Sequence, residues 1–203
     1  MTKILFVHHN SSPGGAELSL ADLACGLSDG ISPLCAVPSG HLASLLGSRR
    51  IPVFIVPMRP VVKSLNPIFW LTAGFTYLRV MIRLIGICRR EKILIVHANS
   101  LTAAIYAAPV SLLFRLPLIW HERDMTRHRF MAPIVAKFAT RIIAISNAVA
   151  ENLKAQLGDS KKIRVIYNGI DVERFRQADV KANPVPGLPS GKRIVLMAAQ
   201  FAP

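Results

Sequence analysis

Short apolar runs alternate with amphipathic stretches along most of the 203-residue chain. The first run, Lys3–Val7, is typical of a strand buried on both faces, and after a polar loop apolar residues recur at helical spacing from Leu20 to Leu27. The alternation continues to residue 170 and predicts an α/β fold with a parallel sheet and helices on both faces. We predict strands at 3–7, 32–37, 53–56, 93–96, 118–120, 141–145 and 163–166, and helices near 20–27, 41–47, 68–88, 101–114, 133–139 and 148–157. Ser146-Asn147 is predicted to cap the last of these helices, and Gly158 to end it.

Polar side chains gather where the predicted strands end. In a parallel sheet the carboxyl ends of the strands meet at one edge, where open α/β sheets bind their ligands. A single histidine after a strand is more often structural, so the recurrence of polar residues is what predicts a crevice here. The residues are His8, Asn10, His97, Asn99, His121, Glu122, Asp124, Ser146 and Asn168.

The loop after the first strand carries the pair Gly14-Gly15, followed by Glu17. Glycine lacks a Cβ, so a ligand can approach the backbone, and the free amides at the start of the next helix suit an anionic group. The loop is neither the G-x-G-x-x-G fingerprint of dinucleotide-binding proteins nor a P-loop. A turn that only caps the helix explains the same residues.

Residues 61–90 admit two interpretations. The stretch Ile68–Cys88 is very apolar, but Arg79 and Arg83 interrupt it on one helical face. Its uncharged part is shorter than the ~20 residues that a membrane-spanning helix needs. It is either a long crossover helix packed on the sheet or a helix lying in a membrane surface, with its basic residues facing anionic headgroups.

The chain is strongly basic, with 25 Lys and Arg against 11 Asp and Glu and a formal net charge of +14. This balance favours partners that carry phosphate: nucleic acid, an anionic membrane or phosphorylated small molecules. The basic residues are scattered and no helix-turn-helix, zinc or RNA-binding aromatic motif accompanies them, which argues against nucleic acid. The sequence also has no G-x-S-x-G motif of a serine hydrolase and no Asp-x-Asp metal pair.

The three cysteines, Cys25, Cys35 and Cys88, have neither Cys-x-x-Cys nor Cys-His spacing. We expect all three to be small buried side chains in a reducing compartment. The first apolar run is too short for a signal peptide and no cleavage-like site follows it, so we expect a cytoplasmic protein.

Four short motifs resemble those of the glycosyltransferases of family four, which are retaining enzymes of the GT-B fold. The motifs are Gly14–Glu17 in the first loop, the strand that ends in His121, the segment Ile143–Ser146, and Asn168–Asp171 with Phe175. They occur in the family's order, and the resemblance covers essentially the whole chain.

The resemblance implies a division of the chain. Residues 1–175 would be a Rossmann-like acceptor-side domain, residues 176–191 a Pro- and Gly-rich linker, and residues 192–203 the first strand of a donor-binding domain that is otherwise missing. The intact enzyme would transfer a sugar from a nucleotide-sugar donor to a hydroxyl acceptor with retention of configuration. The fragment is expected to be inactive alone, and Gln200 stands near the position of the family's phosphate-binding arginine.

The resemblance also assigns roles to residues. His121 would be catalytic, beside the reacting sugar, and the glycines would bring backbone amides to donor phosphate or acceptor hydroxyls. Glu122 and Asp124 would bind sugar hydroxyls or orient His121; ion pairs with Arg123 and Arg127 are the alternative. The substrate-binding residues implied are Gly14, Gly15, Glu17, Asn99, Glu122, Asp124, Ser146 and Asn168, the last two chiefly by fixing loops.

No metal or other cofactor is expected, because this fold class typically needs no metal for the leaving nucleotide diphosphate. Arg123, Arg127 and Arg129 would serve an acceptor that carries lipid phosphate, which suits a cytoplasmic protein or one held peripherally on the inner face of the membrane. The alternative function is a non-catalytic Rossmann-like domain that binds a membrane surface or a partner protein.

Overall fold

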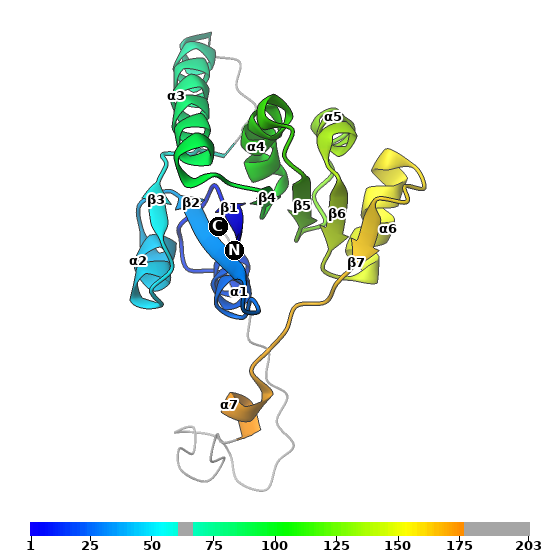
Figure 1. Ribbon diagram of the computed structural model, residues 1–203. Helices are drawn as coiled ribbons and strands as arrows, with labels where there is room; N and C mark the ends of the chain where they lie inside the picture. Colours follow the sequence, from blue (N-terminus) through cyan, green and yellow to red (C-terminus); the bar gives the residue numbers. More distant parts are fainter. Residues whose placement is uncertain (61–66, 177–203) are drawn as a thin grey trace, which may run out of the picture. The chain divides into compact units, whose positions relative to one another are not determined.

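The structure is a computed structural model that describes residues 1–60 and 67–176 (Figure 1). Its strands form one parallel sheet of seven, in the order β3-β2-β1-β4-β5-β6-β7, which confirms the predicted class. The strands are β1 Thr2–Val7, β2 Ile31–Val37, β3 Val53–Ile55, β4 Ile95–Ala98, β5 Leu118–Glu122, β6 Arg141–Ala144 and β7 Ile163–Val165. The helices between them are α1 Gly15–Cys25, α2 His41–Ser48, α3 Pro67–Glu91, α4 Leu101–Phe114, α5 Met131–Phe138 and α6 Asn147–Leu157.

Helices cover both faces of the sheet, as predicted (Figure 1). On one face α1 and α2 form a small core in which Phe6 packs with Leu20. On the other face α3 to α6 form a larger core that includes Leu5, Val7 and Trp120. Because successive residues of a strand point to opposite faces, the apolar run of β1 supplies both cores.

Serine side chains define where two helices begin. Ser100 caps α4 by accepting a hydrogen bond of 3.1 Å from the Ala103 amide, and Ser146 caps α6 through the Val149 amide at 3.2 Å. Gly158 ends α6 with a φ of 77°, a value that glycine adopts without strain. The predicted cap and stop of this last helix are therefore confirmed.

Strand β4 begins two residues later than predicted and ends at Ala98, so His97 lies inside the strand instead of after it. The start is delayed because Lys92 turns with a φ of 54° and the Ile93 amide bonds back to the end of α3. The polar His97 is accommodated because its ring packs on Phe6 of β1, with the ring centroids 4.9 Å apart.

Strand β5 is two residues longer than predicted, so His121 and Glu122 are strand residues as well. Its neighbour β6 continues the ladder and pairs His121 with Ile143 and Glu122 with Ala144. The predicted end was wrong because it was placed before the first polar residues, whereas these two side chains are buried. Strands β3, β6 and β7 each end one residue earlier than predicted.

The cysteines do not share one environment. Cys35 and Cys88 are buried as predicted, and burial raises the pKa of their thiols to about 12 and about 11. Cys25 is exposed, so the prediction is wrong for this residue. It is the last residue of α1, and its neighbour Ala24 is the one that faces the core.

The chain divides into two compact units, Met1–Asn168 and Gly169–Pro203. The first holds the whole sheet, and the described part of the second contains the short helix α7, Val172–Arg176, which was not predicted. The predicted domain boundary at residue 175 stays a prediction, and the predicted linker beyond Arg176 and the strand in 192–203 lie outside the described residues. None of the helices described is long and apolar enough to cross a bilayer.

Candidate functional site

The strand order reverses between β1 and β4, and polar residues from both strand ends meet at this point. In open α/β sheets such a switch point forms the crevice that binds ligands. His8 follows β1, Asn99 follows β4, and both side chains are buried. The Asn99 Nδ2 atom lies 3.3 Å from His8 Nδ1, which joins the two strand ends directly.

Glu17 of α1 continues this chain of hydrogen bonds across the first loop. Its Oε1 atom lies 2.8 Å from His8 Nε2 and accepts a bond of 3.2 Å from Asn10 Nδ2. The carboxylate can only accept, so His8 Nε2–H donates to it, and His8 Nδ1 accepts from Asn99 Nδ2. The hydrogen bond from His8 is the main cause that holds the pKa of Glu17 below its ordinary value. Glu17, predicted to bind substrate, thus holds the loop with a buried side chain.

The two glycines of this loop have different surroundings. Gly14 lies in extended backbone just before α1, and a Cβ added there would lie 2.5 Å from Glu17 Oε2. Gly15 is the first residue of α1, and a Cβ added there would meet nothing within 4 Å. Gly14, the N-cap residue, has no side chain to cap α1, and the Glu17 carboxylate lies at the start of the helix, where a hydrogen bond from its own backbone amide is one of the causes that lower its pKa.

Arg123, which follows β5, ties four segments of the chain together. Its Nε donates to Asn99 Oδ1 at 2.8 Å, and its Nη1 donates to Ser19 Oγ at 2.9 Å and to Asn168 Oδ1 at 3.0 Å. Its Nη2 lies 3.4 Å from His121 Nδ1. The flat guanidinium, with donors pointing in several directions, is therefore the centre of a cluster of hydrogen-bonded side chains. The members of this cluster are His8, Asn10, Glu17, Ser19, His97, Asn99, His121, Arg123 and Asn168.

The same guanidinium determines the tautomer of His121. Arginine can only donate, so His121 Nδ1 must accept, and the ring proton is assigned to Nε2. The Nε2 atom of His97, 3.2 Å from the same Nδ1, must then donate to it. His121 Nε2 is buried and has no hydrogen-bond partner among the described residues. The residue predicted to be catalytic therefore holds one unused N–H donor.

Burial keeps both of these histidines neutral. It lowers the pKa of His97 to about 3 and that of His121 to about 2, and the positive charge of Arg123 adds to the effect. Burial also lowers the pKa of Arg123 to about 10, so the arginine stays charged at neutral pH. His121 can therefore act there as a neutral hydrogen-bond donor.

Glu122 points to the face of the sheet opposite to His121, as successive residues of a strand do. It accepts hydrogen bonds from Trp120 Nε1 at 3.0 Å and from the amides of Arg123 and Asp124 at 3.2 and 3.3 Å. Burial, followed by the charge of Asp124, raises the pKa of Glu122 to about 7. These hydrogen bonds hold the turn after β5 and do not reach His121, so orienting His121 is not the role of Glu122. The described residues form no ion pair between Glu122 and an arginine.

Asp124 and Ser146 make their hydrogen bonds away from this cluster. Asp124 is exposed, and its Oδ1 accepts from the Thr126 amide at 2.7 Å, which closes a turn. Ser146 is occupied as the cap of α6. The substrate contacts expected of both residues stay predictions.

From the sequence, one member of the cluster was expected to have a different role and another was missed. Arg123 was expected to serve lipid phosphate, but its side chain is turned inward, and Ser19 was not singled out. A polar residue in the first two turns of a helix that starts at a ligand loop is the signal that points to Ser19. Of the predicted site residues, the cluster unites Glu17, Asn99, His121 and Asn168.

Within residues 1–60 and 67–176, no three His, Cys, Asp or Glu side chains are placed to hold a metal ion. The expectation that the protein needs no metal stays a prediction.

Comparison with known proteins identifies the family. The sequence profile of Glycosyltransferase Family 4 matches residues 13–174. HepE of Anabaena, solved with UDP and glucose, is 26% identical with a TM-score of 0.66, over 85% of this chain and 46% of that one. A glycosyltransferase from Rickettsia africae is 21% identical with a TM-score of 0.67, over 89% of this chain and 46% of that one. MurG of Acinetobacter baumannii is 14% identical with a TM-score of 0.60, over 88% of this chain and 50% of that one. No curated protein matches the sequence.

The chain spans about half the length of these solved structures. The two matches below 25% identity show the fold alone, which is that of one half of a GT-B glycosyltransferase. The family profile, in contrast, covers most of the chain and includes the Gly-Gly loop, His121 and Asn168. The chain belongs to glycosyltransferase family 4.

Proposed function

We propose that this chain is the acceptor-side half of a retaining glycosyltransferase that transfers a sugar from a UDP-sugar to a hydroxyl acceptor. Membership in family 4 supports the reaction type. HepE of Anabaena, 25% identical, is solved with UDP-glucose, which supports a UDP-sugar as the donor. Because the chain spans 45% of that protein, we assign the remaining part of the active site to a donor-binding domain.

The unpartnered Nε2–H of His121 is the observation that carries this proposal. A sugar gains positive charge at its reacting carbon as the bond to the leaving diphosphate breaks. A neutral imidazole donates a hydrogen bond to a sugar oxygen without adding a second positive charge, whereas an imidazolium would oppose the reaction. The low pKa of His121 and the fixed tautomer both favour this use.

The first turn of α1 suits the anionic part of the donor. Its N-cap residue Gly14 has no capping side chain, and Gly15 has open space where a Cβ would stand. A diphosphate approaching here would meet backbone N–H groups and the positive end of the helix dipole. In this proposal Gly15 admits the ligand, while Gly14 makes room for Glu17.

The acceptor in this proposal carries a lipid phosphate. Arg127 and Arg129 are exposed in the segment after β5 and are the residues that would bind it. Arg123, which the sequence placed in the same role, is already bound to Asn99 and Asn168.

Turnover of a His121→Ala variant tests the proposal. The assay measures UDP release and sugar transfer from UDP-sugars by the longest product of the coding sequence, read past the codon for Pro203. We expect kcat to fall roughly 100-fold, because one preorganised donor to the transition state is removed. His41→Ala, at an exposed histidine of α2, is the matched control and should keep normal turnover.

Thermal unfolding of both variants separates catalysis from folding. A His121→Ala protein that stays folded and turns over normally would refute the catalytic role. If the coding sequence ends at Pro203 and the chain releases no UDP from any UDP-sugar, the non-catalytic alternative replaces the transferase proposal.

A further inference from the structure

Two buried histidines, His97 of β4 and His121 of β5, share a hydrogen bond that either ring can donate. His97 Nε2 lies 3.2 Å from His121 Nδ1, and the ring centroids are 5.3 Å apart. Both rings are neutral at pH 7, because burial lowers their pKa values far below the ordinary value. A neutral imidazole has one N–H, so each of the facing nitrogens can be the donor or the acceptor. Only the arrangement in which His97 donates leaves the proton of His121 on Nε2.

Arg123 removes this choice between two arrangements. Its Nη2 lies 3.4 Å from the same His121 Nδ1, and a guanidinium has N–H donors but no acceptor. A proton on Nδ1 would therefore face a second N–H group in a buried site, which costs free energy. The arrangement in which His97 donates is the one that satisfies all three side chains.

The Arg123 guanidinium is itself held in place on its other side. Its Nη1 donates to Ser19 Oγ at 2.9 Å and to Asn168 Oδ1 at 3.0 Å. The guanidinium is planar, so these bonds also fix the direction of Nη2. Arg123 cannot turn away from His121 without losing bonds to two other segments of the chain.

A second chain of hydrogen bonds starts at Arg123 and is fixed at both of its ends. Arg123 Nε donates to Asn99 Oδ1 at 2.8 Å, so Asn99 presents its Nδ2 to His8 Nδ1 at 3.3 Å. His8 Nε2 then donates to Glu17 Oε1 at 2.8 Å. Because the Glu17 carboxylate can only accept, it holds the proton of His8 on Nε2 even without the arginine.

The pair of His97 and His121 has no such second constraint. His121 Nε2 is buried and has no hydrogen-bond partner within residues 1–60 and 67–176, so nothing there holds a proton on this atom. The direction of the bond between the two rings therefore depends on Arg123.

We propose that Arg123 is a positioning residue that sets the direction of the hydrogen bond between His97 and His121 and so keeps the proton of His121 on Nε2. The catalytic consequence rests on the proposed function, which uses this Nε2–H group. Without Arg123 both arrangements become available, and in the second one His121 presents a lone pair at Nε2 in place of a donor. Arg123 thus acts on the reaction through His121.

The proton positions can be measured in the 203-residue chain without any transfer reaction. Two-bond correlations between ring protons and nitrogen-15 distinguish the two neutral forms of each histidine, and single-histidine variants assign the signals. At pH 7 we expect His8 and His121 of the wild type to carry their protons on Nε2. In Arg123→Met, His121 should lose this single form and gain the Nδ1–H form, whereas His8 should keep its form because Glu17 still accepts from it.

The wild-type spectrum already puts the proposal at risk, so the test does not depend on whether Arg123→Met folds. A proton on Nδ1 of wild-type His121 would overturn the proposal. So would an unchanged His121 in a folded Arg123→Met protein. His97→Phe separates the two donors, since Phe keeps a ring against Phe6 while Arg123 still donates to His121. His121 should keep its proton on Nε2 in this variant, and its loss would assign the role to His97 instead.

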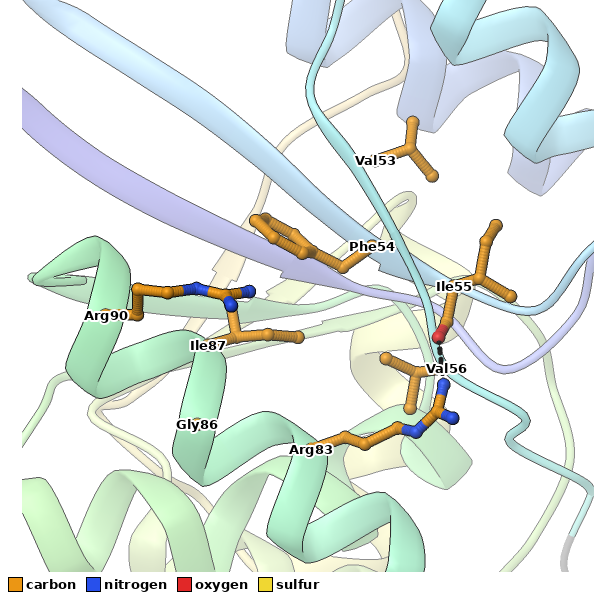
Figure 2. Close-up of a pocket in the computed structure, with 8 residues that line it drawn as sticks. All are labelled: Val53, Phe54, Ile55, Val56, Arg83, Gly86, Ile87 and Arg90. Carbon is orange, nitrogen blue, oxygen red and sulfur yellow. Dashed lines mark hydrogen bonds between the residues drawn. The ribbon is translucent and has the colours of Figure 1, made fainter.

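Arg83 of α3 provides the matched control. Helix α3 packs on the sheet, as the first of the two interpretations of this stretch predicted, with Leu84 and Ile87 buried in the larger core. Arg83 Nη1 donates to the Ile55 carbonyl at 2.8 Å beside a groove of about 400 Å³ between α3 and the edge strand β3 (Figure 2). None of the described residues that line this groove is a histidine. Arg83→Met should therefore leave the form of every histidine ring unchanged.

Transfer kinetics of the longest product of the coding sequence test the catalytic consequence. We expect Arg123→Met to lower kcat by ~2-fold or more, because about half of the molecules or more would carry the wrong form of His121, with KM unchanged. In a His121→Ala background Arg123→Met should lower kcat no further, since both changes remove the same donor. A further loss there would overturn the proposal that Arg123 acts through His121. If the ring forms change as expected while kcat does not, the catalytic use of Nε2–H fails and the positioning of the proton by Arg123 stands.

Discussion

At the residue scale, Gly14 is constrained by a neighbouring carboxylate and not by its own backbone. Its φ of −168° is extended and open to any residue. The space for a Cβ is taken by Glu17 Oε2, and the other oxygen of that carboxylate is held by His8 and Asn10. Any larger residue at position 14 must therefore displace a side chain that is already hydrogen-bonded.

We predict that Gly14→Ala lowers the free energy of unfolding by about 1–3 kcal/mol, the usual range for forced overpacking. Gly15→Ala is the matched control and should be neutral or stabilising by up to about 1 kcal/mol, because its Cβ meets open space in a helix. Urea unfolding measures both. In a Glu17→Ala background the cost of Gly14→Ala should largely disappear; an unchanged cost there would show that the carboxylate is not the cause.

Single residues were predictable from the sequence where their neighbours are close along the chain. The Gly-Gly loop and His121 stand in short motifs beside predicted strands. The role of Arg123 was not predictable, because its partners Ser19 and Asn168 are 104 and 45 residues away. No local pattern distinguishes an arginine that is turned inward from one that faces solvent.

At the scale of elements, helix α6 depends on the hydroxyl of Ser146. This oxygen satisfies the Val149 amide, one of the N–H groups that a helix start leaves without a partner. The sequence predicted both this cap and a substrate contact for the same residue. The two roles require different variants to separate them.

We predict that Ser146→Ala lowers the free energy of unfolding by about 1 kcal/mol and that Ser146→Asp does not, because Asp is an equally good cap. Thermal or urea unfolding measures this difference. If Ser146 also binds substrate, Ser146→Asp should raise KM in the transfer assay while the protein stays as stable as the wild type. A stable Ser146→Ala protein would contradict the capping role.

Strand ends were the least predictable feature of the elements. Apolar pattern placed the end of β5 at Trp120, but pairing with β6 carries the strand on to Glu122. The length of a strand depends on how many residues of the neighbouring strand are placed to pair with its backbone. A single sequence segment does not contain that information. The strands themselves were predictable because each is a short apolar run flanked by polar residues.

At the scale of the whole molecule, buried ionisable groups make stability depend on pH. His97 and His121 bind protons in the unfolded chain below their ordinary pKa of 6.5, but in the folded protein only near pH 3 and 2. Falling pH therefore favours the unfolded state. His9, with a pKa lowered to about 4 by burial, acts in the same direction. Glu122 acts in the opposite direction, because it takes up its proton near pH 7 when folded and near 4.5 when unfolded.

We predict that the free energy of unfolding falls by on the order of 2–3 kcal/mol between pH 6.5 and pH 5, because the histidines outweigh Glu122. Glu122→Gln removes the opposing contribution and should increase this loss by on the order of 1–2 kcal/mol. Urea unfolding at the two pH values measures both. Glu151→Gln, at an exposed acid of α6, is the control and should leave the pH dependence unchanged. Equal stability of the Glu122→Gln variant at both pH values would contradict the prediction that the buried histidines stay neutral in the folded protein.

The overall architecture was largely predictable, because regular alternation of strand and helix signals admits few arrangements other than a parallel sheet. The order of the strands was not, since local pattern does not say which strands are neighbours. That order, with β1 beside β4, is what brings His8 and Asn99 into contact.

The long-range hydrogen bonds of Arg123 have a consequence for synthesis of the protein on the ribosome. Ser19 and Asn168, which bond to each other and to Arg123, are 149 residues apart. At ~5–20 residues per second, about 7–30 s pass between the translation of the first and of the second. Throughout that interval the segment of α1 has been translated but the cluster around Arg123 is incomplete. The hydrogen-bonded cluster around Arg123 is therefore among the last parts of the sheet unit to be assembled, and a nascent chain that stops before Asn168 cannot complete it.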